Sequence, residues 1–403
     1  MNAFSMALRG LKERALSSAL TALSVALGVA LVVAVLVLER EARAAFHGTA
    51  HGVEILVGGT KGGRIDTLLS ALYHVGRAPG RVPWSLYEKL KEHGDVAYAV
   101  PLAFGDRYRN MPVVGTTEEI FTRFRPRPGV AFEIEGATFA GGGRRAVVGA
   151  EAARTTGLRI GDTFYPSHSG LDDDPRHRDE TFTVVGVARA TGTAHDRAIW
   201  VDIGDFLSLK GHEGMFRDGG EEPGVSAILV KTSSPYPWVV EDLIRRINDG
   251  DEAQAIRPLQ VVGELFALVG TVQRMLTWTA WLVVVVAAAG AMVSLYHAMA
   301  ERRRDVALLR ALGASRRRIV LTVLLESMLL CGGGAVLGLL LGHGAAALAA
   351  PVLEARAGVR LDAATLLPEE PFLLLALLGV GALAGIAPAL RAYRVDVAAQ
   401  VAR

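Results

Sequence analysis

Four long apolar runs are the feature that most constrains how this chain can fold. They cover residues 15–38, 275–300, 319–350 and 372–390. A helix needs about 20 predominantly apolar residues to cross the hydrocarbon core of a bilayer, so we predict four transmembrane α-helices. The composition agrees with this. With 51% hydrophobic and 21% charged residues, the chain is too apolar for an ordinary soluble enzyme and too charged for a protein buried wholly in lipid.

The first run has one property of a secretory signal peptide, since basic residues (Arg9, Lys12 and Arg14) precede it. The apolar core of a signal peptide is only about 7–15 residues long, however, and this run is longer. We therefore interpret it as a span that is not cleaved.

The positions of lysine and arginine predict the orientation of the spans. The loop over residues 301–318 carries seven arginines, and the flanks at 1–14 and 391–403 are also basic. The loop over 351–371 mixes acidic and basic residues. We therefore expect a protein of the bacterial inner membrane with both termini on the cytoplasmic side. Residues 39–259 are then expected on the opposite side, in the periplasm or outside the cell.

The long segment between the first two spans is expected to form an α+β domain. Stretches such as TFTVVGVA and VSAILVKT are typical of strands, and PWVVEDLIRRINDG is typical of a helix that ends at a glycine. Strand-rich parts lie on both sides of Pro101, so we expect two subdomains. A helical pattern then leads into the second span, which predicts one long helix over residues 260–300.

No motif for catalysis or nucleotide binding is visible. GGTKGGR has glycines and a lysine, but neither the spacing nor the Ser or Thr of a phosphate-binding loop. We therefore expect a non-enzymatic chain that binds no cofactor itself. The net charge of +2 gives no broad basic field for nucleic acid, and the single cysteine, Cys331, excludes an internal disulfide.

One loop collects imidazoles and carboxylates that can ligate a metal ion. In SHSGLDDDPRHRDE the candidate ligands are His168, Asp172, His177 and Asp179. Acidic turns are common on protein surfaces, so we favour a solvated loop and no metal, with metal binding as the weaker alternative.

The third span contains two ionisable residues, Glu326 and His343. Ionisable groups inside a membrane are candidates for function. Glu326 lies near the arginine-rich end and can instead pair with an arginine, so we favour a packing or dimer-contact role over a transport role. Gly334, Gly338 and Gly342 recur every four residues on one helix face, which predicts close packing of spans within the chain or across a dimer.

The arginine-rich loop is predicted to be a short amphipathic helix. Leu308, Leu309 and Leu312 share one side, and Arg310 lies opposite. Gly313 then ends or kinks the helix, and Ser315 can cap the start of the next span. Attraction to anionic lipid explains the arginines but not the apolar side, whereas a docking surface for a cytoplasmic partner explains both.

Four stretches resemble permeases of the macrolide-exporter and lipoprotein-releasing family of ABC transporters (MacB, LolC, LolE and FtsX-like proteins). They are ALRGLKERALSSALTALSVALGVA, AVVGAEAARTTGLRIGDTF, ERRRDVALLRALGASRRRIV and APALRAYRVDVAAQVAR. The resemblance covers nearly the whole chain and keeps the order of the parts. It implies an amphipathic helix at the amino terminus, a MacB-like core domain outside and a cytoplasmic tail. One departure is Asp305, where the family usually has Glu.

The resemblance also implies a mechanism. A coupling helix would contact a dimer of separate ABC ATPase subunits, which bind ATP and Mg, and the permease itself would work as a homodimer or heterodimer. The contact residues implied are Asp305, Leu308, Leu309, Arg310, Leu312, Gly313 and Ala314. ATP-driven movement of the second span would then move the outside domains without carrying substrate through the membrane helices.

The expected function is export or extraction of a substrate such as a lipoprotein, a peptide or a small amphiphile, with an envelope adaptor or lipoprotein as a further partner. The alternative is an FtsX-like transducer that activates a cell-wall hydrolase outside and transports nothing. An outside domain of about 220 residues is large for such a regulator and favours the exporter. A membrane-anchored enzyme or metal sensor is disfavoured by the lack of a catalytic motif.

Overall fold

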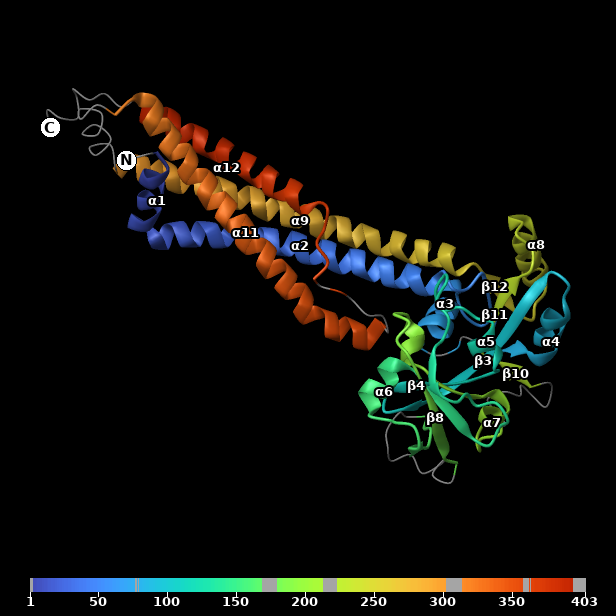
Figure 1. The fold of residues 1–403 in the computed structure, drawn as a ribbon. Coiled ribbons are helices and arrows are strands. Elements are labelled where there is room, and N and C mark those ends of the chain that lie inside the picture. Colours follow the sequence, from blue (N-terminus) through green and yellow to red (C-terminus); the bar gives the residue numbers. More distant parts are fainter. Residues whose placement is uncertain are drawn as a thin grey trace. The chain divides into compact units, whose positions relative to one another are not determined.

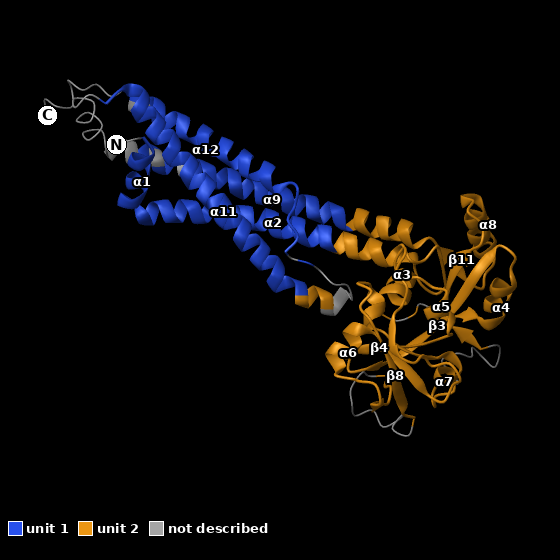
Figure 2. Cartoon of the chain, viewed as in Figure 1, with its two compact units in different colours: residues 1–41, 269–350, 362–403 blue, residues 42–268, 351–361 orange. Residues whose placement is uncertain are grey.

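The computed structural model describes residues 3–76, 78, 80–168, 180–212, 223–301, 314–357, 362 and 364–393. The chain forms two compact units (Figure 2). The helical unit comprises residues 1–41, 269–350 and 362–403, and the sheet unit comprises residues 42–268 and 351–361.

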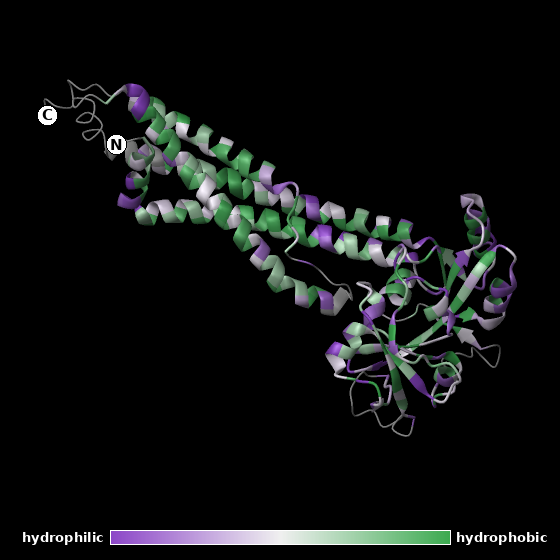
Figure 3. Ribbon diagram, in the orientation of Figure 1, coloured by the Kyte–Doolittle hydropathy of each residue, from purple (hydrophilic) through white to green (hydrophobic). Residues whose placement is uncertain are grey.

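Among the described residues, five helices contribute to the helical unit (Figure 1). They are α1 (Ala3–Glu13), α2 (Ala15–Ala50), α9 (Pro258–Glu301), α11 (Arg316–Ala357) and α12 (Glu370–Tyr393). Within the described part of the chain, the last four are long and apolar enough to cross a membrane. Figure 3 shows apolar residues along all four. Each contains one of the runs predicted to span the membrane, and each extends beyond its run.

Helices α2 and α9 lie side by side and antiparallel in the helical unit. The hydroxyl oxygens of Ser17 and Ser294 are 2.9 Å apart, and Gln273 Nε2 donates a hydrogen bond to Glu39 Oε2 over 2.6 Å. Between these contacts, a Cβ on Gly28 would lie 2.9 Å from a methyl of Val284. Lipid offers no hydrophobic driving force for helices to associate, so close approach and interhelical hydrogen bonds hold such a pair together.

A mixed sheet forms the centre of the sheet unit. Its strands follow the order β12-β1-β11-β3-β4-β9-β6-β8-β5, and β7 pairs with β8. The β4–β9 and β6–β8 pairs are parallel, and the other neighbours are antiparallel. The strands are β1 (Ile55–Gly58), β3 (Val96–Tyr108), β4 (Met111–Thr116), β5 (Ile134–Gly136), β6 (Arg145–Val148), β7 (Thr163–Phe164), β8 (Phe182–Ala188), β9 (Ile199–Asp202), β11 (Ala227–Thr232) and β12 (Gln254–Ile256). A second pair joins β2 (Val82–Pro83) to β10 (Gly224–Val225).

Short helices complete the sheet unit. They are α3 (Arg64–Tyr73), α4 (Trp84–Glu92), α5 (Glu119–Thr122), α6 (Ala150–Thr156), the 3₁₀ helix η2 (Ala194–Arg197), α7 (Ile203–Leu207) and α8 (Pro237–Asn248). The largest buried side chains include Trp200 of β9 and Phe206 of α7. The two stretches predicted to be strands, TFTVVGVA and VSAILVKT, contain β8 and β11, and the predicted helix PWVVEDLIRRINDG contains α8.

The strands on either side of Pro101, where two subdomains were predicted, form one sheet, and the division into subdomains stays a prediction. Pro101 lies inside β3, opposite Ile228 of β11, and the strands on both sides of it belong to one sheet. The proline carbonyl accepts a hydrogen bond of 2.8 Å from the Thr116 hydroxyl. Registered pairing with β4 begins only at Leu102, so the missing N–H of Pro101 interrupts no pair on that side, and the sheet is continuous through the proline.

The carboxyl-terminal turns of α2 and the amino-terminal turns of α9 pack within the sheet unit. Phe46 and Phe266 make a T-shaped contact with ring centroids 5.7 Å apart. The Tyr73 hydroxyl donates a hydrogen bond of 2.6 Å to the Phe46 carbonyl, and Arg64 pairs with Glu264 at 3.3 Å. The boundary between the two units thus falls inside two continuous helices.

Candidate functional sites

Most of the predicted coupling segment lies outside the described residues. This applies to Asp305, Leu308, Leu309, Arg310, Leu312 and Gly313, whereas Ala314 is described and half-buried. Its two flanks are defined, since α9 ends at Glu301 and α11 begins at Arg316. Ser315 caps α11 as predicted, because its hydroxyl accepts a hydrogen bond of 3.3 Å from the Arg318 backbone N–H.

The three glycines of the predicted packing face lie against α2. An added Cβ would be 2.7 Å from the Ala22 carbonyl oxygen at Gly334, 2.5 Å from Val29 Cβ at Gly338 and 2.7 Å from Val33 Cβ at Gly342. Real Cβ atoms do not approach other atoms so closely, so these positions accept no larger residue without a shift. The partner helix belongs to the same chain.

A second row of small residues was not singled out from the sequence. A Cβ on Gly381 of α12 would lie 2.9 Å from Cys331 Cβ, and one on Gly385 would lie 3.0 Å from Ser327 Cβ, both on α11. The Ser327 hydroxyl also donates a hydrogen bond to the Gly381 carbonyl. The four-residue spacing of Gly381 and Gly385 was the available signal.

The two ionisable residues of α11 have different surroundings. Glu326 is buried. His343 lies with its Nε2 atom 2.9 Å from Oε1 of Glu370, the first residue of α12. The same Glu370 oxygen accepts a hydrogen bond of 2.9 Å from the Leu367 backbone N–H. His343 therefore takes part in a contact between two helices of the chain.

The structure brings His168 close to two residues that sequence reasoning missed, Asp106 of β3 and His212, which follows α7. The metal-ligating atoms of these three side chains all lie within 4.8 Å of one another. The other predicted candidates, Asp172, His177 and Asp179, lie outside the described residues. No sequence signal joins Asp106, His168 and His212, because they are far apart in the chain and come together only through the fold.

Two further histidines, His74 and His195, are buried beside Trp200. The His195 ring lies 5.8 Å from both the His74 ring and the Trp200 ring, measured between centroids. Within the described part of the chain, neither imidazole has a hydrogen-bond partner. Burial lowers the pKa of His195 to about 4. Burial, aided by His195 and by Arg197 and Arg107, lowers the pKa of His74 well below its usual value.

A polar groove of about 1140 Å³ also lies on the sheet unit. Its lining combines cationic side chains with Glu54 and two tyrosines; the cations include Arg123, Arg125, Lys231 and Arg257, and the tyrosines are Tyr98 and Tyr236. Hydrogen bonds from Thr232 and the charge of Lys231 outweigh desolvation and lower the pKa of Glu54. The groove offers charge and aromatic surface, and its Thr232 hydroxyl donates a hydrogen bond of 2.7 Å to Glu54.

Comparisons with known proteins match both halves of the chain. A model of the MacB-like periplasmic core domain matches residues 18–247, and a model of the FtsX-like permease C-terminal matches residues 279–397. An uncharacterized ABC transporter permease of Methanocaldococcus jannaschii is 27% identical over 183 residues, which is 45% of this chain and 43% of that protein. The match therefore spans less than half of that relative's length.

Two solved structures are also similar. The periplasmic region of MacB from Actinobacillus actinomycetemcomitans has a TM-score of 0.35 at 10% identity, covering 54% of this chain and 94% of that one. The extracellular domain of the noncanonic ABC-type transporter YknZ from Gram-positive bacteria has a TM-score of 0.32 at 15% identity, covering 51% of this chain and 98% of that one.

The first family model alone covers more than half of the chain, and the second accounts for the helices that follow it. Four apolar helices and a mixed sheet unit between the first two of them fit the same family. The chain therefore belongs to the family of ABC transporter permeases with a MacB-like periplasmic core domain and an FtsX-like carboxyl-terminal region, and it is a multi-pass membrane protein.

Proposed function

We propose that this permease transmits the energy of ATP hydrolysis, carried out by separate ATPase subunits, into movement of its sheet unit outside the membrane. One observation carries the proposal. Helix α9 is continuous from Pro258 to Glu301, its first turns pack within the sheet unit, and its last residue adjoins the arginine-rich segment. A movement imposed at one end of such a helix reaches the other end.

Helix α2 supports this role for α9. A single helix is held by its own backbone hydrogen bonds, and a second helix packed along it resists bending. The contact of Gly28 with Val284 and the hydrogen bond from Gln273 to Glu39 tie the two helices together. The close packing of Gly338 on Val29 adds α11 to the same bundle. Displacement of the arginine-rich segment would thus move α9 as part of a stiff assembly.

In this proposal an ABC ATPase dimer, with its own ATP and Mg, docks in the cytoplasm on residues 305–314. Two permease copies form the membrane part, and movement of their sheet units exports or extracts a lipoprotein, peptide or amphiphile. The arginines favour a position on the cytoplasmic side of the bacterial inner membrane for this segment and for both termini. An envelope adaptor or lipoprotein would act on the outer side.

Docking is tested by replacing Leu309 and Leu312 with Asp. A charge on the apolar side of the segment should abolish co-purification of the ATPase while the permease still inserts into the membrane. The matched control is Leu366→Asp, an exposed leucine in the loop between α11 and α12, which should retain the ATPase. ATPase bound equally by all variants would refute docking at this segment.

Transmission is tested at Val269, an exposed residue of α9 near the boundary of the two units. Val269→Pro removes a helical hydrogen bond and kinks the helix, whereas Val269→Ala leaves it straight. In the complete complex, ATP should change hydrogen exchange in the sheet unit of the Ala variant but not of the Pro variant. Both variants should still bind the ATPase. An undiminished response in the Pro variant would rule out transmission through α9.

A further inference from the structure

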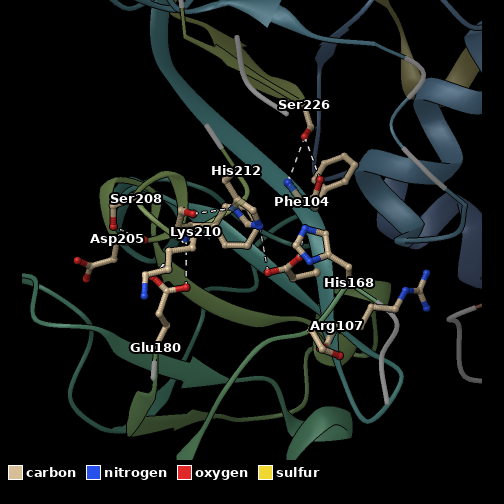
Figure 4. A network of polar contacts seen from close by, with 12 residues as sticks. Phe104, Arg107, His168, Glu180, Asp205, Ser208, Lys210, His212 and Ser226 are labelled. Atoms are coloured by element: carbon tan, nitrogen blue, oxygen red, sulfur yellow. Dashed lines mark hydrogen bonds and ion pairs between the residues drawn. The ribbon is translucent and has the colours of Figure 1, made fainter. Parts of the chain in front are cut away.

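We propose that Asp106, His168 and His212 bind a divalent transition-metal ion of the zinc class in the sheet unit. Figure 4 shows the imidazoles of His168 and His212 approaching each other at this place. Their ring centroids are 5.3 Å apart, with the planes nearly perpendicular. The proposal is independent of the transport mechanism.

The ligand atoms all lie within 4.8 Å of one another, close enough for one ion to draw them together. Asp106 Oδ2 lies 3.2 Å from His212 Nε2, and Asp106 Oδ1 lies 3.6 Å from His168 Nε2. Zinc binds nitrogen and oxygen ligands at about 2.0–2.2 Å in tetrahedral geometry, which separates neighbouring ligands by roughly 3.4 Å. Nitrogen and carboxylate donors suit zinc, whereas calcium and magnesium prefer all-oxygen sets.

The hydrogen bond on the far side of His212 favours a cation. His212 Nδ1 lies 2.9 Å from the Phe206 carbonyl oxygen, which can only accept, so Nδ1 carries a proton. The Nε2 atom then faces Asp106 Oδ2, so a divalent cation can bind both atoms. An imidazole that donates through Nδ1 to a carbonyl and presents Nε2 is the usual arrangement of a metal-bound histidine.

Burial strengthens this argument. The side chains of Asp106 and His212 are both fully buried. A charged imidazolium–carboxylate pair in such a place has a large desolvation cost. A divalent ion coordinated by the carboxylate and both imidazoles gives these buried polar atoms a shared partner. His168 is 22% exposed, so the three ligands are not all enclosed.

The fold positions the three ligands through backbone contacts. Arg107 and Ser167 exchange two backbone hydrogen bonds of 2.8 Å, which hold His168 beside Asp106. On the other side, the Asp202 carboxylate caps the start of α7, the helix that carries Phe206. These contacts preorganise the site, so ion binding requires little rearrangement.

The test uses the full chain, purified in detergent with an affinity tag that contains no histidine. Calorimetry with Zn²⁺ should show one ion per chain, and Co²⁺ should give the visible absorption of a tetrahedral nitrogen–oxygen site. Zinc at a hundredfold excess over its Kd should raise the Tm of the sheet unit by roughly 5–10 °C.

Two variants keep the test specific. His168→Ala removes a partly exposed ligand, and Asp106→Asn keeps the side-chain shape but removes the charge; each should weaken Zn²⁺ binding at least tenfold. His93 lies elsewhere on the sheet unit, so the control variant His93→Ala should bind Zn²⁺ as tightly as the parent does. If the parent binds no Zn²⁺, or if the ligand variants bind it as well as the His93 variant does, the proposal is overturned, and the cluster is a His–Asp–His hydrogen-bond network.

Discussion

His343 and Glu370 join two helices of the membrane part, with Nε2 and Oε1 2.9 Å apart. Glu370 begins α12, and its carboxylate also accepts a hydrogen bond from Leu367. A negative charge in the first turn of a helix is favoured by the helix dipole. One carboxylate therefore fixes the start of α12 and attaches it to α11.

Replacing Glu370 with Ala should loosen α12. The change leaves the His343 ring and the Leu367 N–H without their acceptor, a loss of about 1–3 kcal/mol. Glu370→Gln keeps an accepting oxygen, so this variant should lose much less stability than the alanine variant. Glu369→Ala is the control, because its pair with Arg40 is largely exposed and contributes at most about 1 kcal/mol. Apparent Tm values in detergent measure the difference, and equal Tm values for the Glu370 and Glu369 alanine variants would contradict the role of this contact.

Gly338 should tolerate no side chain. A Cβ there would be 2.5 Å from Val29 Cβ and 2.7 Å from the Ala26 carbonyl oxygen, so Gly338→Ala must push α2 and α11 apart. Overpacking of this kind costs about 1–3 kcal/mol and should lower the apparent Tm. Gly344→Ala, on the same helix with open space around it, should leave the Tm unchanged or slightly higher, because Ala favours helix. A Tm that falls equally in both variants would point to helix flexibility instead of close packing.

The membrane helices could be predicted from sequence because hydropathy is a local property. The ends could not. The first apolar run ends at Leu38, where charges begin, but the helix that contains it continues to Ala50. Its last turns are held by tertiary contacts, such as that of Phe46 with Tyr73 and Phe266, which no pattern within the helix reveals.

The sheet and the metal cluster depend even more on long-range contacts. Individual strands were recognisable from their β-branched residues, but the parallel pairing of β4 with β9 joins segments far apart in the chain. A bridge between two other distant residues, Arg107 and Ser167, holds His168 beside Asp106, and His212 also lies close to both. Sequence reasoning could only group His168 with its neighbours in the loop, such as Asp172 and His177.

The two buried histidines, His74 and His195, should make the sheet unit sensitive to acid. Both have a pKa below the value of about 6.5 in an unfolded chain, so the native state binds fewer protons there. The stability that these two neutral histidines contribute to the sheet unit is therefore fully present above pH 6.5, and it is lost as the pH falls toward 4. From the pKa of about 4, His195 alone should cost roughly 2 kcal/mol between pH 7.5 and pH 5.

The measurement is the Tm of the sheet unit as a function of pH. His195→Phe removes the titrating group and keeps an aromatic ring beside Phe124 and Trp200, so it should reduce the loss of Tm at pH 5. His93→Ala should keep the acid sensitivity of the parent. If the His195 variant loses as much stability as the parent between pH 7.5 and pH 5, protonation of this residue does not drive the acid effect.

The orientation of the chain can be tested with single cysteines in a Cys331→Ala background. Glu92 of α4 and Lys12 of α1 are both exposed, so cysteines at either position should react readily. The basic flanks predict that Glu92→Cys reacts with a membrane-impermeant maleimide in intact spheroplasts, whereas Lys12→Cys reacts only after lysis. The reverse pattern would place the sheet unit in the cytoplasm, where an ATPase at the arginine-rich segment could no longer reach the permease, and the proposed direction of transmission would fail with it.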